Sequence, residues 1–329
     1  MAAIAAVGVV VVARLGGGGG ESPSGTASPT PTATSAQSAA PRPVTSWRDV
    51  GYDLTYKADL VEKLPAPPEL VMLGGSRAQR FEPSHIERVT GLSAFNFAVQ
   101  NCRPEDAYAI SRYLIERAPG VKLQCFFAVQ ATTFGEIPMH PGLLYDPRLV
   151  RSFPDALVAE QKEANEPLEV RRVPSSNRFS SRGRLLYNSY DKRLDAGGTQ
   201  ERAMRIYLDR MVPKAGSTTQ VSQRRSRAYF RKLLALFNDR GVTPAIVIMP
   251  YHPDALSAFL EVGWQRKQDP LKGYLRSLQD EYDFRVLDYT EIGSFGGRPE
   301  WFYDGAHITK ENARLVFEQA VRDAPECFR

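Results

Sequence analysis

The sequence has only three cysteines, Cys102, Cys125 and Cys327, and only four histidines among its 329 residues. No cysteine belongs to a CxxC pair or lies near a set of histidines, which argues against a structural zinc site. The chain also lacks a GxxxxGK[ST] loop and a glycine fingerprint directly after a strand. We therefore predict no metal and no cofactor. The cysteines allow one disulfide with one thiol left over, or three buried free thiols.

No apolar run reaches the ~20 residues that span a bilayer. The longest lies at the N-terminus, where residues 2–13 are almost wholly apolar. It fits a signal-peptide core or a truncated anchor, and a start codon placed too far downstream would explain its shortness and its missing basic region. Residues 16–46, dominated by Gly, Ser, Thr, Ala and Pro, predict a flexible stalk. We thus expect a signal or anchor segment at 1–15 and a globular domain at 47–329.

This organisation predicts a domain outside the cytoplasm that is held at the cell membrane by a single N-terminal anchor, or is secreted. The alternative is a disordered apolar tail on a cytoplasmic protein.

The net charge of +5 owes much to arginine, including five arginines in a Ser- and Asn-containing stretch: Arg171, Arg172, Arg178, Arg182 and Arg184. Such a stretch suits an anionic polymer or a lipid headgroup. Neither interleaved aromatic residues nor a nucleic-acid motif accompanies it, so we favour a solvated loop and expect no nucleic-acid partner.

From residue 69 onward, short apolar runs alternate with amphipathic stretches, which is typical of an α/β fold with a parallel sheet. Five strands are predicted, at 69–73, 94–99, 122–129, 244–249 and 284–289. Helices are predicted at 84–90, 104–117, 199–211, 220–240, 254–264, 270–282 and 310–322, the last capped by Thr309. Residues 130–198 lack sustained periodicity, so they predict a long insertion with one helix near 147–162.

Ligands of open parallel sheets bind beyond the carboxyl ends of the strands, and two polar motifs stand there. Gly74-Gly75-Ser76-Arg77 follows the first strand, where a sharp turn can expose the Ser76 hydroxyl. Asp304-Gly305-Ala306-His307 follows the last strand, and a serine nucleophile needs an imidazole base oriented by a carboxylate. Alone, each motif is weak, because Gly-Gly-Ser is usually a plain turn and Asp-x-x-His arises by chance.

Together, the serine after the first strand and the Asp-x-x-His before the last helix resemble the layout of the SGNH hydrolase superfamily, from residue 69 to the C-terminus. Four motifs are similar to its extracytoplasmic branch, which includes the alginate O-acetylation proteins and the D-alanine transfer proteins of teichoic acids. They are Leu-Gly-Gly-Ser-Arg at 73–77, Phe-Asn-Phe-Ala-Val-Gln-Asn at 95–101 with Pro104-Glu105-Asp106, Ile-Met-Pro-Tyr-His-Pro at 248–253, and the terminal Asp-Gly-Ala-His.

The resemblance implies a three-layer α/β/α flavodoxin-like fold with a five-stranded parallel sheet. It implies that Ser76 attacks an ester carbonyl, that His307 takes and returns the proton, and that Asp304 orients His307. A water acceptor would give an esterase and a sugar hydroxyl an acyltransferase. The implied partners are a carbohydrate or cell-envelope polymer as substrate and a membrane-bound protein as acyl donor. The Ser76 Oγ should then lie within hydrogen-bond reach of the His307 ring.

The oxyanion hole departs from the superfamily pattern of a serine N–H, a glycine after the second strand and an asparagine after the third. Asn101 stands at the glycine position, and Ala98 stands where related sequences often have another glycine. Asparagine tolerates a left-handed backbone well, so Asn101 can still point its N–H inward. Gln130 replaces the third donor, and a lost donor costs on the order of a hundredfold in turnover.

Three further residues lie on the same rim. Tyr251 and His252 follow the fourth strand, and we favour local turn packing over substrate contact for both. Arg77 either pairs with an anionic substrate or ties down the insertion.

Two alternatives to an enzyme stay open. One is a catalytically inactive protein of the same fold that binds glycan or scaffolds a polymer-modifying complex, which the atypical oxyanion positions favour. The other is a cytoplasmic flavodoxin-like binding protein.

Overall fold

The computed structural model describes residues 53–135, 139–165, 177–216 and 224–329, all of which belong to one compact unit. The segments predicted at 1–15 and 16–46 lie outside these ranges, as do Arg171 and Arg172. Within the described ranges, no helix combines the length and the apolar character needed to cross a bilayer.

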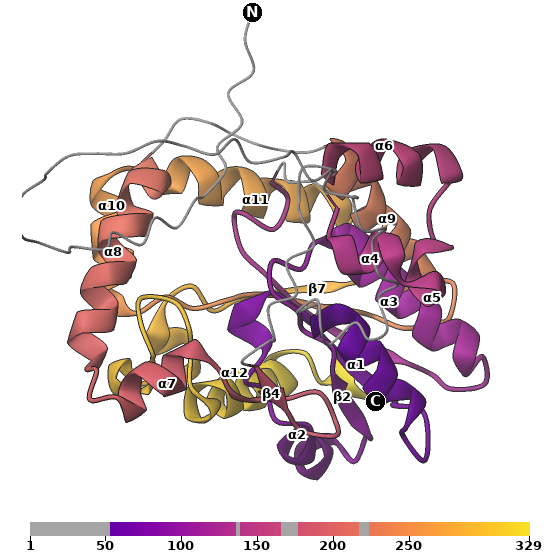
Figure 1. Ribbon diagram of the computed structural model, residues 1–329, viewed down its shortest axis with the longest axis horizontal. Helices are drawn as coiled ribbons and strands as arrows, with labels where there is room; N and C mark the ends of the chain where they lie inside the picture. Colours follow the sequence, from indigo (N-terminus) through magenta and orange to yellow (C-terminus); the bar gives the residue numbers. More distant parts are fainter. Residues whose placement is uncertain (1–52, 136–138, 166–176, 217–223) are drawn as a thin grey trace, which may run out of the picture. The chain divides into compact units, whose positions relative to one another are not determined.

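The centre of the fold is a parallel sheet of five strands in the order β2-β1-β3-β6-β7 (Figure 1). The strands are β1 Leu70–Gly74, β2 Ala94–Asn96, β3 Gln124–Val129, β6 Ala245–Ile248 and β7 Arg285–Asp288. β1, β3 and β6 are buried along their whole length, as expected of strands covered on both faces. The order is that of flavodoxin-like doubly wound sheets, so the predicted fold class is confirmed.

Helices cover both faces of the sheet, and successive strand residues point into opposite cores. Val71, Phe127 and Ile246 face a core formed with α1 Asp53–Glu62, α3 Pro104–Arg117, α9 Arg224–Asn238 and α11 Gln265–Leu278. Met72, Phe126 and Val247 face the other core, formed with α2 Pro83–Thr90 and α12 Lys310–Asp323. In Figure 1, α9 and α11 lie above the strands and α2 and α12 below them.

The termini of two predicted helices differ in detail. Thr309 occupies the N-cap position of α12, but its hydroxyl donates to Glu311 Oε2 at 2.7 Å and does not cap the backbone. Helix α11 begins at Gln265, five residues before the predicted start at Pro270. The preceding helix, α10 Pro253–Glu261, is ended by Gly263 at φ +76°, so the new helix starts at once and contains the proline.

The insertion has more structure than its sequence predicts. In place of one helix near 147–162 there are three, α4 Pro141–Tyr145, α5 Pro147–Val150 and α6 Asp155–Asn165. Each of the three helices begins at a proline or directly after one, since a proline favours the first turn of a helix and disfavours its interior. An unpredicted hairpin, β4 Arg178–Phe179 and β5 Leu185–Tyr187, then leads into α7 Ser189–Asp195.

Arg178, Arg182 and Arg184, the described arginines of this stretch, each contact another side chain of the domain. Arg182 forms an ion pair with Glu87 of α2, and Arg184 pairs with Glu82 directly before that helix. Arg178 lies over the ring of Tyr187, at 4.3 Å from its centroid. The two ion pairs fasten the insertion to the domain.

The three cysteines are buried free thiols, which matches the second of the two alternatives. Burial raises the pKa of all three, so each behaves as a small apolar side chain.

Candidate active site

The nucleophile candidate lies on a tight turn at the carboxyl end of β1. Gly74 adopts φ +139°, and a Cβ there would lie 2.7 Å from the Cβ of Ala128 on β3. Glycine is therefore required at this position. Gly75 has an ordinary extended backbone and open space around it, so the turn depends on the first glycine alone. Ser76 then opens the short 3₁₀ helix η2 Ser76–Ala78.

The acid and base candidates share a closed loop before α12. Tyr303 N–H donates to His307 O at 2.7 Å, and Asp304 Oδ1 accepts the backbone N–H groups of Ala306 and His307, each at 2.9 Å. A Cβ on Gly305 would lie 2.3 Å from the Tyr207 ring, so only glycine fits between the two catalytic candidates. The loop therefore holds Asp304 and the His307 backbone in one arrangement.

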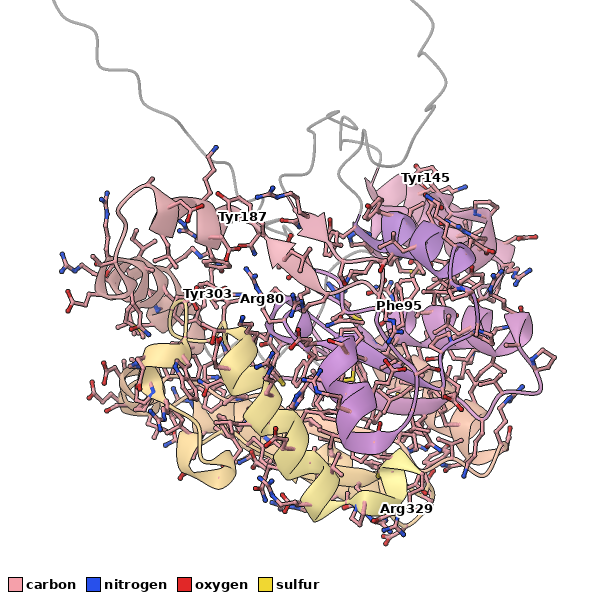
Figure 2. The ribbon with its side chains drawn as sticks, turned by 90° about the horizontal axis from the view of Figure 1, so that it is seen from below. Arg80, Phe95, Tyr145, Tyr187, Tyr303 and Arg329 are labelled. Atoms are coloured by element: carbon pink, nitrogen blue, oxygen red, sulfur yellow. The ribbon has the colours of Figure 1, made fainter. Side chains whose placement is uncertain are left out.

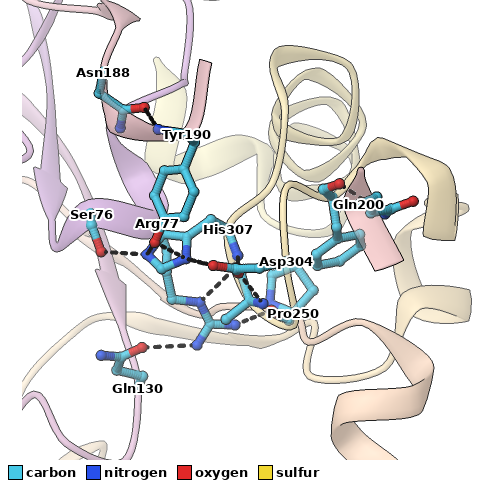
Figure 3. A network of polar contacts seen from close by, with 11 residues as sticks. Ser76, Arg77, Gln130, Asn188, Tyr190, Gln200, Pro250, Asp304 and His307 are labelled. Atoms are coloured by element: carbon cyan, nitrogen blue, oxygen red, sulfur yellow. Dashed lines mark hydrogen bonds and ion pairs between the residues drawn. The ribbon is translucent and has the colours of Figure 1, made fainter. Parts of the chain in front are cut away.

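The structure brings the three candidates together in one chain of hydrogen bonds (Figure 3). Ser76 Oγ lies 2.9 Å from His307 Nε2, and His307 Nδ1 lies 2.9 Å from both carboxylate oxygens of Asp304. The His307 side chain is 16% exposed and that of Asp304 only 5%. This arrangement leaves the imidazole accessible at the serine and shields the carboxylate from water.

Asp304 is ionised in this setting. Burial by itself would raise the pKa of Asp304, but the hydrogen bond and charge of His307, with the two backbone N–H groups, hold that pKa below its usual value. An ionised Asp304 accepts the hydrogen on His307 Nδ1, which leaves Nε2 as the acceptor for the Ser76 proton. Asp304 thus favours the His307 tautomer that serine activation requires.

Asn101 lies beside Ser76 in a left-handed backbone conformation, with φ 56°. The chain after β2 stays alongside β1, because Val99 N–H donates to Gly74 O at 2.9 Å. Ser76 and Asn101 both line the cleft at the nucleophile. Within the described ranges, neither of their backbone N–H groups donates a hydrogen bond, so both are available to a bound oxygen.

Gln130 lines the same cleft, but its donors are mostly occupied. Its backbone N–H donates to Thr133 Oγ1 and its amide nitrogen to Thr132 Oγ1, each at 2.9 Å. Its amide oxygen accepts from Arg77 Nη1 at 2.9 Å. One amide hydrogen is left for a substrate, so the oxyanion site rests on Ser76 and Asn101.

Arg77 borders the cleft, but its side chain is buried and engaged by the protein. Its guanidinium donates to Ala306 O at 3.2 Å, to Met249 O at 3.0 Å and to Pro250 O. It also lies 4.1 Å from the centroid of the Tyr251 ring. Arg77 therefore joins the nucleophile turn to the end of β6 and to the His307 loop, so its contacts are structural.

His252 and Tyr251 are packed within the domain, as the turn-packing interpretation expects. His252 is the N-cap of α10, where Nδ1 accepts the Asp254 N–H at 3.2 Å, and burial lowers the pKa of this histidine. Its own N–H donates to Gly305 O at 3.1 Å, which fixes the loop of the acid and base candidates. Tyr251 is 7% exposed and belongs to a cluster with α8 Gln200–Gly216 and α10.

Two tyrosines that the sequence did not point to surround the imidazole. Tyr190 of α7 places its hydroxyl 3.0 Å from His307 Nδ1, and its ring centroid lies 4.7 Å from that of His307. Tyr207 of α8 meets the imidazole edge-on at 6.4 Å. Tyr190 lies in the insertion, whose sequence shows no periodicity that would place it at the site.

Lys57 of α1 is a further residue that sequence reasoning missed. Its side chain is fully buried, and Nζ donates to Asn96 O at 2.9 Å and to Ala98 O at 2.6 Å. Burial lowers the pKa of Lys57 to about 7, although the charge of Asp53 acts in the opposite direction. Lys57 fixes the end of β2, from which the chain continues to Asn101.

No protein-family model matches this chain, and no curated protein sequence matches it. Among the described residues, no group of three or more His, Cys, Asp or Glu side chains could hold a metal ion. The chemistry of the site is therefore inferred from the geometry of its own residues.

Proposed function

We propose that this protein is a serine esterase or O-acyltransferase of the SGNH type. One observation carries the proposal: Ser76 Oγ, His307 and Asp304 form a continuous chain of 2.9 Å contacts at the carboxyl edge of the sheet. Ser76 and Asn101 line the same cleft, and neither backbone N–H donates a hydrogen bond to the part of the chain that the structure describes. Nucleophile, base, orienting carboxylate and oxyanion donors are the parts that acyl transfer needs.

The proposed reaction has two halves. Ser76 Oγ attacks the ester carbonyl as His307 Nε2 takes its proton, and the oxyanion is held by the N–H groups of Ser76 and Asn101. The bond to the alkoxy oxygen breaks, His307 returns the proton to that oxygen, and the acyl group stays on Ser76. Water or a sugar hydroxyl then loses a proton to His307, attacks the acyl carbonyl and releases Ser76, which regains the proton.

As an esterase, the protein would act on an acylated cell-envelope or extracellular polysaccharide. As a transferase, it would move an acyl group from a membrane-bound donor protein to such a polysaccharide. The four motifs similar to envelope-polymer proteins support this substrate class. We also propose that residues 1–15 anchor the domain at the cell membrane or direct its secretion. Fractionation of cells that express the full chain tests the location, and recovery in the cytoplasmic fraction would contradict it.

The second candidate is an inactive glycan-binding or scaffold protein of the same fold. The occupied donors of Gln130 favour it, since the third oxyanion contact is largely lost. It predicts retained binding of polysaccharide without turnover.

Hydrolysis of 4-nitrophenyl acetate separates the two candidates. We expect the wild type to release 4-nitrophenolate above background, and Ser76→Ala to fall to background. Ser277→Ala is the matched control, because Ser277 is exposed and its hydroxyl only donates to Tyr274 O. With soluble oligosaccharide present, recovery of acylated sugar identifies a transferase and free acetate an esterase. A wild type at background, or a Ser76→Ala variant as active as wild type, contradicts the proposal.

A further inference from the structure

Tyr190 reaches the catalytic imidazole from an element far from it in sequence. Its hydroxyl lies 3.0 Å from His307 Nδ1 and 3.4 Å from Nε2, and Figure 3 shows its phenol ring pointing at the histidine. The ring also stacks on Tyr303 with centroids 5.8 Å apart. Tyr190 therefore contacts both the His307 ring and a second aromatic ring.

Helix α7, which carries Tyr190, is fixed at its first turn. Asn188 Oδ1 accepts the Tyr190 N–H at 2.9 Å, and Asp191 accepts the Asn188 N–H at 2.8 Å in a reciprocal capping box. Asp191 also forms an ion pair with Arg80 and accepts the Tyr303 hydroxyl at 3.1 Å.

Arg80 connects this helix to the nucleophile turn, four residues after Ser76. Its guanidinium donates to Leu185 O at 3.3 Å and to Leu186 O at 3.1 Å, just before α7. It also lies 4.8 Å from the centroid of the Tyr303 ring, and Figure 2 shows the two side chains next to each other. Tyr190 is thus positioned by contacts with the segment that follows Ser76 and with the segment that precedes His307.

The hydrogen on His307 Nδ1 determines the hydrogen-bonding role of the Tyr190 hydroxyl. Nδ1 carries one hydrogen, which Asp304 accepts at 2.9 Å. The Tyr190 oxygen, 3.0 Å from Nδ1, therefore lies beside this hydrogen as a second acceptor. Burial and then the charge of Asp304 raise the pKa of Tyr190, so the phenol stays protonated and uncharged.

We propose that Tyr190 is a positioning residue of this triad: its hydroxyl oxygen meets the hydrogen on His307 Nδ1 while its ring lies against the His307 ring, and the two contacts fix the imidazole. The proposal rests on the proposed function. Tyr190 restricts the imidazole to the orientation that faces Ser76.

Other charged or titratable groups face this pair from each element packed around it. They are Asp304 on the His307 loop, Tyr207 on α8, Arg77 on η2 through Ala306 O, and Arg193 and Arg210 near Tyr190. All of them are kept in a Tyr190→Phe variant, which removes only the hydroxyl.

The test is the proton NMR signal of the hydrogen on His307 Nδ1 in the full chain, assigned by its loss in His307→Gln. Tyr190→Phe should shift this signal and speed its exchange with water several-fold relative to wild type, because the variant removes the second oxygen at that hydrogen. The matched control is Tyr187→Phe, since the Tyr187 hydroxyl bonds to Asp195 at 2.8 Å. This control should leave the signal and its exchange rate unchanged. An unchanged signal in Tyr190→Phe would overturn the proposal.

Kinetics supply the second readout. Tyr190→Phe should lower kcat about threefold to tenfold, with KM within twofold of wild type, because a positioning group acts on the transition state. An unchanged kcat in the presence of wild-type activity overturns the positioning role. If the wild type itself shows no turnover, the proposed function fails, and the NMR signal alone decides the role of Tyr190. A thermal melt equal to that of Tyr187→Phe shows that the fold is kept.

Discussion

Ser76 Oγ lies 2.9 Å from His307 Nε2, although the two residues are 231 positions apart in the sequence. The sheet order brings them together, because Ser76 follows β1 and the His307 loop follows β7 at the same edge. The strand order also reverses between β1 and β3, where doubly wound folds bind their ligands. The candidate active site thus lies at the position where this topology favours ligand binding.

The acid and base partners should be indispensable for turnover. We expect His307→Gln to lower kcat/KM for 4-nitrophenyl acetate roughly a thousandfold or more. Asp304→Asn should lower it roughly a hundredfold to ten-thousandfold, since an amide no longer favours the required tautomer. His252→Asn is the control, because asparagine can replace the N-cap of α10. Equal losses in all three variants would contradict the assignment.

The backbone conformation of Asn101 should matter more than its side chain. Asn101→Gly should keep kcat/KM within about threefold of wild type, because glycine adopts a left-handed backbone freely. Asn101→Val should lower kcat/KM at least about tenfold and reduce the free energy of unfolding by about 1–2 kcal/mol.

Gln100→Val provides the control for Asn101, since Gln100 is exposed and has no positive φ. If the valine variants at positions 100 and 101 behave alike in turnover, Asn101 does not supply an oxyanion donor.

Arg77 should contribute to stability in a way that lysine cannot reproduce. Its planar group donates to carbonyls of Ala306, Met249 and Pro250 and stacks on an aromatic ring, so Arg77→Lys leaves buried acceptors unpaired. We expect the free energy of unfolding in urea to fall by about 2–4 kcal/mol. Arg231→Lys, at an exposed ion pair with Glu281, should change it by less than about 0.5 kcal/mol. Similar changes in both variants would refute this role.

His140 should make the domain less stable as the pH falls from about 6.5 to about 4. Burial and, to a lesser extent, the charge of Arg103 lower the pKa of His140 to about 4. Between that value and 6.5 the unfolded chain binds a proton that the folded chain does not, so acid favours unfolding. His140 Nδ1 caps α4 by accepting the Gly142 N–H at 3.1 Å, a role that asparagine can fill.

The free energies of unfolding of wild type and His140→Asn at pH 7 and pH 4.5 test this linkage. The variant should lose less stability between the two pH values than the wild type does. Equal losses would show that His140 does not carry the effect.

The sequence predicted the sheet because its strands are short runs rich in apolar residues that alternate with amphipathic stretches. It also placed Asn101 correctly as a residue suited to a left-handed backbone, since that preference is local. The contacts of Arg77 and Lys57 could not be predicted, because each side chain binds carbonyls of segments distant in sequence. Tyr190 escaped prediction because its place depends on Arg80 and Asp191, which pair only in the folded chain.

Reaction of the full chain with a fluorophosphonate, followed by intact mass and peptide mapping, tests the central claim most directly. We expect a single adduct on Ser76, absent from Ser76→Ala and formed much more slowly in His307→Gln. The absence of an adduct on the wild type, or an adduct that persists in Ser76→Ala, would show that Ser76 is not the nucleophile.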